Sequence, residues 1–99
     1  MVSTSATYLE AKTVVKMVRE VSADILKKPG SEIILGANYT DDLRADSLDM
    51  VDLVAGLEEK VEEVLGFTEF EISDQEAENL HTVRDVVEFI LQRGYPAAA

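Results

Sequence analysis

The sequence has no cysteine and only one histidine in 99 residues. The lack of cysteine excludes disulfide bonds, thiolate metal sites and a cysteine nucleophile, and it is typical of a reducing compartment, so we expect a cytoplasmic protein. His81 has no catalytic partner near it in the sequence, and both the GxSxG elbow of hydrolases and the glycine-centred calcium loop are missing. We therefore predict no catalytic residue and no dedicated metal site.

Basic residues are scarce as well. The chain has 9 Lys and Arg against 20 Asp and Glu, a formal net charge of −11. This excess argues against nucleic acid or an anionic membrane as a partner, because phosphates repel carboxylates, and it favours partner proteins with basic surfaces. No apolar run is long enough to cross a membrane, and the first ten residues lack the features of a signal peptide. We therefore predict no membrane insertion.

Helical periodicity predicts an all-α protein. Pro29-Gly30 and Gly66 are helix stop signals, while Ser73-x-x-Glu76 and Thr82-x-x-Asp85 are spaced like capping boxes. The predicted fold is a small four-helix bundle of three main helices and one short helix, with a long first loop over residues 28–46. The helices are expected at residues 7–27, 47–65, 74–80 and 83–94, in a single domain at 7–94 between a disordered lead (1–6) and tail (95–99).

The segments between the predicted helices contain many apolar residues. This composition predicts that the segments pack against the helices, because a free loop would leave those side chains in water. The residues expected to pack are Ile33, Ile34, Leu35, Tyr39 and Leu43 in the first loop, and Phe67, Phe70 and Ile72 after the second helix.

The second predicted helix has two apolar faces. At about 100° per residue, the predicted core side contains Met50, Leu53, Val54, Leu57, Val61 and Val64. A second strip, roughly half a turn away, contains Leu48, Val51 and Ala55, and Asp52, Glu58, Glu59 and Glu62 border it. Scattered exposed apolar residues are ordinary in proteins, but a contiguous strip with a charged rim favours an interaction surface.

Ser47 stands at the start of this helix. One interpretation is structural: Ser47, or Asp46 beside it, caps the helix N-terminus. The other is chemical: another enzyme modifies Ser47, since the helix dipole and free backbone amides there favour a phosphate on its hydroxyl.

The stretch LRADSLDMVDLVAGLEEKVEEV resembles the second helix of acyl carrier proteins, whose motif Asp-Ser-Leu is matched by Asp46-Ser47-Leu48. The stretches ANYTDDLRADSLD and EFEISDQEAENLHTVRDVVEFI resemble the end of the family's first loop and its last two helices. The likeness covers about residues 10–93. It implies that a phosphopantetheinyl transferase attaches 4′-phosphopantetheine from coenzyme A to Ser47, and that the arm's thiol carries acyl groups as thioesters. The protein itself would be a monomer without catalytic activity.

The resemblance also implies a recognition surface on the second helix. It would meet basic docking patches on acyl-transfer, condensing and other acyl-processing enzymes of fatty-acid, polyketide or specialised lipid synthesis. The matching residues are Asp46, Leu48, Asp49, Val51, Asp52, Ala55, Glu58 and Glu59. The alternative hypothesis is an acidic helical interaction module that binds a basic protein without covalent modification.

Two residues depart from the family pattern. Arg44 stands where a glycine is usual, and Ser73 replaces a common proline. The stretch around EVLGFTEF is also a few residues longer than in the housekeeping fatty-acid carrier. These departures favour a carrier dedicated to one pathway or to an unusual acyl chain.

Overall fold

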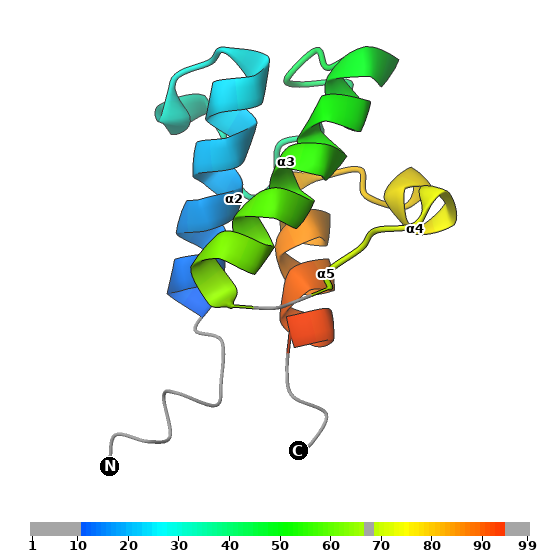
Figure 1. The fold of residues 1–99 in the computed structure, drawn as a ribbon. Coiled ribbons are helices and arrows are strands. Elements are labelled where there is room, and N and C mark those ends of the chain that lie inside the picture. The colour runs from blue at the N-terminus through cyan, green and yellow to red at the C-terminus, as the bar shows by residue number, and fades with distance from the viewer. Residues whose placement is uncertain (1–10, 67–68, 95–99) are drawn as a thin grey trace.

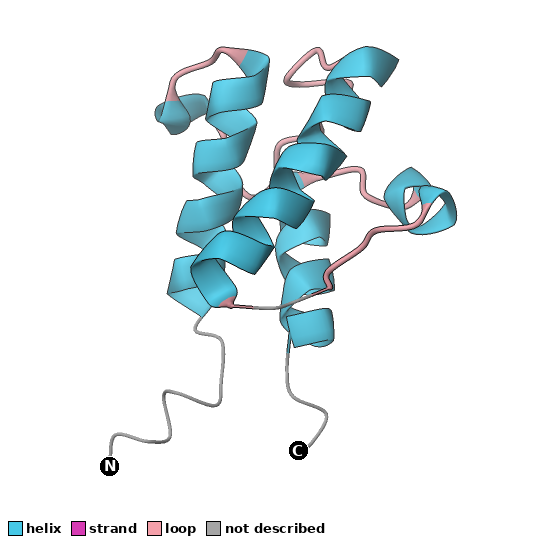
Figure 2. Cartoon of the chain, viewed as in Figure 1, coloured by secondary structure: helices cyan, strands magenta, loops and turns pink. Residues whose placement is uncertain are grey.

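The computed structural model describes residues 11–66 and 69–94. Within these ranges the fold is all-α, without a strand, and a single isolated bridge pairs Asn38 with Thr82. The prediction of a small helical bundle is confirmed (Figures 1 and 2). Its elements are α2 (Ala11–Leu26), the 3₁₀ helix η1 (Gly30–Glu32), α3 (Ser47–Leu65), α4 (Asp74–Glu78) and α5 (Val83–Gly94).

The predicted boundaries hold best where a local signal sets them. The bounds of α3 and α5 are confirmed, α4 is two residues shorter than predicted, and η1 was not predicted at all. Both predicted capping boxes are present. Ser73 and Glu76 cap α4, and before α5 the Asp85 N–H donates to Thr82 Oγ1 while Asp85 Oδ2 accepts from the Thr82 N–H. Four of the predicted features lie outside the described residues: the lead (1–6), the first four residues of the predicted first helix (7–10), Phe67 and the tail (95–99).

The helix ends use left-handed backbone conformations. Gly66 follows α3 with φ 77°, where a side chain would be strained. Lys27 follows α2 with φ 55°, and the next amide, that of Lys28, donates to Ala23 O over 3.0 Å. A lysine is unusual in this conformation, and α2 therefore ends at a residue that costs some stability.

Helix α2 packs against both α3 and α5, and all three can be followed in Figure 1. At the contact of α2 with Gly56 of α3, an added Cβ would lie 3.3 Å from Val21 Cγ1. Val64 was placed on the core side, but it is 49% exposed, so that prediction is wrong. The buried apolar residues of the helices are Val14, Met17, Val18, Val21, Leu53, Leu57, Val61, Val83, Val86, Val87 and Ile90.

The long loop between α2 and α3 is part of the core. Ile33, Tyr39 and Leu43 are buried, as predicted, and Leu35 is partly buried. Ile34 is 60% exposed, so the prediction that it packs is wrong. A loop segment of two consecutive isoleucines can bury one side chain while the next one points outward, and composition alone does not distinguish the two.

Tyr39 links this loop to α2 and to the segment before α5, and it also holds the end of the loop just before α3. Its hydroxyl shares a 2.8 Å hydrogen bond with Ser22 Oγ of α2. Its backbone N–H donates to His81 O, just before α5, over 2.9 Å, and its carbonyl accepts from Ala45 N–H, just before α3, over 2.8 Å. The side chain is fully buried. One loop residue thus fixes the loop to all three main helices.

The segment after α3 is held by carboxylates of α3 itself. Glu58 Oε2 accepts from the Ile72 N–H over 2.8 Å, and Glu62 Oε2 accepts from the Phe70 N–H over 3.1 Å. Phe70 and Ile72 are buried, as predicted. The Arg93 guanidinium lies 5.7 Å from the Phe70 ring centre and pairs with Glu76 at 2.9 Å.

Replacing Tyr39 by Phe should destabilise the fold by about 1–2 kcal/mol, because the buried Ser22 hydroxyl loses its partner. Burial raises the pKa of Tyr39 to about 12, although the Ser22 hydrogen bond opposes this rise. The protonated form is therefore favoured in the folded state, and its contribution is complete below about pH 10 and lost between pH 10 and 12. Denaturant unfolding from pH 8 to 12 should show a shallower alkaline loss in Tyr39→Phe.

The double variant Ser22→Ala/Tyr39→Phe is the control, because it removes both partners of the hydrogen bond. It should be less destabilised than the sum of the two single variants. Strict additivity would show that the two hydroxyls do not interact.

Candidate functional site

The start of α3 is capped by two aspartates. Asp46 Oδ1 accepts from the Asp49 N–H over 2.8 Å, and Asp49 Oδ2 accepts from the Asp46 N–H over 3.0 Å. This reciprocal pair is a capping box in which Asp46 is the N-cap. Of the two residues considered for the cap, the structure selects Asp46, and Ser47 becomes the first residue of the helix.

The Ser47 hydroxyl is consequently free. Ser47 is exposed, and its side chain has no hydrogen-bond partner within residues 11–66 and 69–94. The other described serines differ: Ser22 is buried against Tyr39, Ser73 Oγ caps α4, and Ser31 lies in the three-residue helix η1. Ser47 alone of these four stands at the positive end of a long helix, 19 residues in length, where the dipole and first-turn amides favour an attached phosphate.

The second apolar strip of α3 faces solvent. Leu48 is 67% exposed, Val51 is 63% exposed, and Ala55 is exposed as well. The strip begins directly after Ser47 and continues along the helix for more than one turn. An apolar surface of this kind beside an exposed hydroxyl can bind a partner protein while that hydroxyl is presented to it.

The five predicted recognition carboxylates fall into two groups. Asp46, Asp52 and Glu59 are exposed. Asp49 and Glu58 are partly buried, and each accepts a backbone hydrogen bond, Asp49 from Asp46 and Glu58 from Ile72. The second role of Glu58 was not visible in the sequence, because its partner lies 14 residues away.

Arg44 has a strained backbone beside this site. Its φ is 61°, in the left-handed region, which costs a non-glycine residue roughly 1–2 kcal/mol. The side chain is exposed and forms no ion pair with any residue that the structure describes. The protein thus maintains an unpaired positive charge three residues before Ser47.

The other residues considered in the sequence lie apart from the start of α3. His81 is exposed, and its backbone N–H donates to Asp85. Burial opposes ionisation of Asp85, but hydrogen bonds from the Thr82 and His81 amides outweigh it and lower its pKa. Among the described residues, no cluster of three His, Cys, Asp or Glu could hold a metal ion. No helix in this part of the chain has the length and apolar character needed to span a membrane.

Comparisons with known proteins show the family to which the chain is similar. A family profile described as "Phosphopantetheine attachment site" matches residues 16–90. A protein of Clostridium perfringens (strain 13 / Type A) named "Acyl carrier protein" is 43% identical over 75 residues, which cover 76% of this chain and 90% of that protein. Another of that name, from Exiguobacterium sibiricum, is 47% identical over 73 residues, 74% of this chain and 84% of that protein.

The chain belongs to the acyl carrier protein family. Acyl carrier proteins hold phosphopantetheine covalently, and the start of α3 fits such a group. Asp46 already caps the helix, so the Ser47 hydroxyl can be esterified without the loss of a structural hydrogen bond. The φ of Arg44 also explains why a glycine is usual at its position in acyl carrier proteins, since glycine adopts this conformation without strain.

Unfolding free energies can distinguish the capping role of Asp46 from the role of Ser47, whose hydroxyl has no hydrogen-bond partner among the described residues. Asp46→Ala should cost about 1 kcal/mol, since it removes the cap of α3. Ser47→Ala should change stability by less than about 0.5 kcal/mol, because its hydroxyl has no partner in the fold. Urea denaturation of both variants checks this. A larger cost for Ser47→Ala than for Asp46→Ala would mean that serine is the cap.

Proposed function

We propose that this acyl carrier protein carries acyl groups as thioesters on a 4′-phosphopantetheine arm attached to Ser47. The observation that carries the proposal is the free, exposed Ser47 hydroxyl at the N-terminus of α3. In the attachment step Ser47 Oγ forms a new P–O bond to the phosphopantetheine phosphorus of coenzyme A. The pyrophosphate P–O bond breaks, adenosine 3′,5′-bisphosphate leaves, and the hydroxyl proton passes to a base of the transferase. When attached, the arm supplies the thiol that holds the acyl group.

Ser47 needs no base of its own in this scheme. Nothing in the described part of the chain activates its hydroxyl, and the transferase supplies that chemistry. The contribution of the chain is to position the serine: the capping box fixes the backbone on both sides of Ser47, and the first turn of α3 directs positive potential toward the phosphate. The lack of cysteine in the sequence fits such work in the cytoplasm, where thiols stay reduced.

The partner surface is proposed to be the exposed strip of Leu48, Val51 and Ala55. Asp46, Asp52 and Glu59 surround it with charge that suits Arg and Lys on a transferase or an acyl-processing enzyme. Exposed ion pairs contribute only about 0–1 kcal/mol each. That weakness suits a carrier that must dock, deliver and dissociate. Asp49 and Glu58 contribute less to this surface, because their carboxylates also hold the fold together.

Intact-mass measurement tests the attachment. After incubation with coenzyme A and a broad-specificity phosphopantetheinyl transferase, the chain should gain one phosphopantetheine, and Ser47→Ala should gain none. If the unaltered chain gains no phosphopantetheine, the Arg44→Gly variant is tested in the same way. A mass gain in this variant would mean that Arg44 prevents recognition by the transferase. If neither the unaltered chain nor Arg44→Gly gains phosphopantetheine, the alternative of an acidic interaction module, which predicts no modification, would be the better account.

We further propose that the chain serves one pathway or an unusual acyl group instead of general fatty-acid synthesis. Arg44 supports this, because it keeps a positive charge beside Ser47 at the cost of backbone strain. In a strain without its housekeeping carrier, the chain should support little growth, and Arg44→Gly should support more. Arg44→Gly should also be about 1 kcal/mol more stable. Full rescue by the unaltered chain would contradict specialisation.

A further inference from the structure

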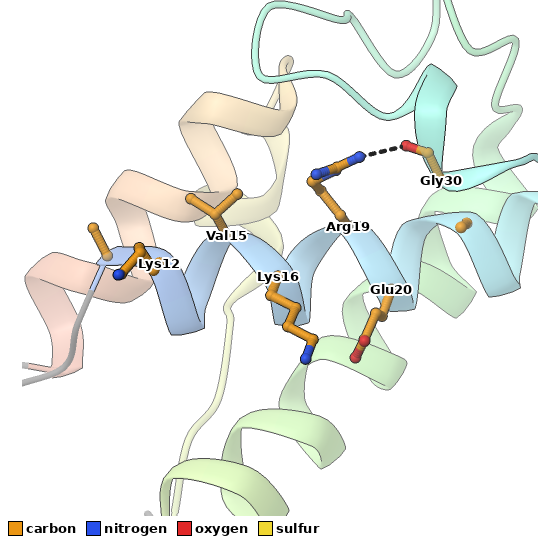
Figure 3. Close-up of a pocket in the computed structure, with 8 residues that line it drawn as sticks. Lys12, Val15, Lys16, Arg19, Glu20 and Gly30 are labelled. Atoms are coloured by element: carbon orange, nitrogen blue, oxygen red, sulfur yellow. Dashed lines mark hydrogen bonds between the residues drawn. The ribbon is translucent and has the colours of Figure 1, made fainter.

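A groove of about 650 Å³ runs along the outer side of α2. Figure 3 shows Lys12, Val15, Lys16 and Arg19 along this helix, with Gly30 of η1 beside the end of Arg19. Ala11, Val15 and Ala23 supply apolar surface. Among residues 11–66 and 69–94, the lining comes from one helix and one residue of η1, so this part of the chain leaves the groove open on its other side.

The groove does not belong to the Ser47 site. Val21 and Ile25 are the residues of α2 that lie nearest Gly56 of α3. At about 100° per residue, Arg19 and Ala23 point roughly half a turn away from Val21. The side of the groove formed by Arg19 and Ala23 therefore faces away from α3, while Lys16 and Glu20 also line a smaller hollow beside Val64 in the last turn of α3. Since the exposed strip of α3 lies nearer its first residue, Ser47, a partner on that strip would leave the groove accessible.

The charge of the groove is opposite to that of the molecule. Lys12, Lys16 and Arg19 line it against one acid, Glu20. Residues 11–28 as a whole contain five basic and two acidic residues, whereas residues 29–99 contain four basic and 17 acidic residues. Positive charge is thus concentrated on α2 and the two residues that follow it, Lys27 and Lys28, in an otherwise acidic protein. A surface of this charge suits an acidic partner, whereas the carboxylates of α3 suit a basic one.

Arg19 is fixed at the edge of this groove. Its Nη2 donates to Gly30 O over 2.9 Å. Its Nε is buried and has no hydrogen-bond partner among the residues that the structure describes. A guanidinium that is held in place and partly removed from water attracts a nearby carboxylate more strongly than a fully hydrated one does.

We propose that this groove docks an acidic amphipathic helix of a partner protein. Its apolar side chains would cover Ala11, Val15 and Ala23, and its carboxylates would meet Lys12, Lys16 and Arg19. An open groove on one helix suits a long segment better than a small molecule, which pockets normally enclose on most sides. A membrane or a nucleic acid fits poorly, because the net charge of −11 repels phosphates. A second copy of the chain fits poorly as well, because it carries the same net charge and the two copies repel each other.

Titration of the ¹⁵N-labelled chain with a synthetic 14-residue helical peptide tests the proposal. The peptide has Leu on one face and Glu elsewhere. Amide shifts should be confined to residues 11–30, and Lys12→Glu/Lys16→Glu should weaken binding by roughly tenfold or more. The matched control is Lys60→Glu/Arg84→Glu, which changes the net charge equally on other helices and should leave binding unchanged. A peptide with Lys in place of Glu should not bind.

Several results would overturn the proposal. No binding of the acidic peptide, shifts centred on another helix, or equal weakening by both double variants would each exclude a specific acidic partner at this groove. Binding to phosphatidylglycerol vesicles that Lys12→Glu/Lys16→Glu abolishes would identify a membrane surface as the occupant. Concentration-dependent self-association that the same variant abolishes would identify a second copy. All of these measurements are made without phosphopantetheine on the chain. A negative result would therefore exclude the groove proposal and leave the proposed role of Ser47 unaffected.

Discussion

The position of Tyr39 is the constraint on which the rest of the structure depends. A loop of twenty residues, 27–46, joins α2 to α3, and such a loop has no fixed course unless buried contacts specify one. Tyr39 provides these contacts through its hydroxyl to Ser22, its N–H to His81 O and its carbonyl to Ala45 N–H. Since these partners lie on α2, before α5 and before α3, one buried residue sets the relative positions of the three main helices.

The consequences of this arrangement reach Ser47 within a few residues. Ala45 is held by Tyr39, and Asp46, which follows it, caps α3. The cap satisfies the backbone at the helix start, so the hydroxyl of Ser47 has no structural task and remains available for modification. Arg44, on the other side of Ala45, adopts the strained left-handed backbone conformation. Structural and chemical roles are thus assigned to neighbouring residues, and a change in one need not disturb the other.

Local patterns in the sequence predicted local structure well. Gly66 located the end of α3, and the two capping spacings located the starts of α4 and α5. The 100° periodicity identified Leu48 and Val51 as a separate strip that the structure shows exposed. The failures involve partners distant in sequence. The exposure of Ile34 and Val64 depends on which neighbours cover them. The hydrogen bond from the Ile72 N–H to Glu58 depends on the course of the segment that follows α3. The basic residues of α2 were visible as composition, but a groove requires knowing which face of α2 remains uncovered.

The central claim is that Ser47 is the residue to which the chain's chemistry is attached. Site mapping tests it most directly: the chain is modified with coenzyme A and a transferase, digested, and the modified peptide is sequenced by tandem mass spectrometry. The account predicts phosphopantetheine on Ser47 and none on Ser22, Ser31 or Ser73, because these are buried, lie in a minimal helix, or act as a cap. Modification at any other residue would contradict the account.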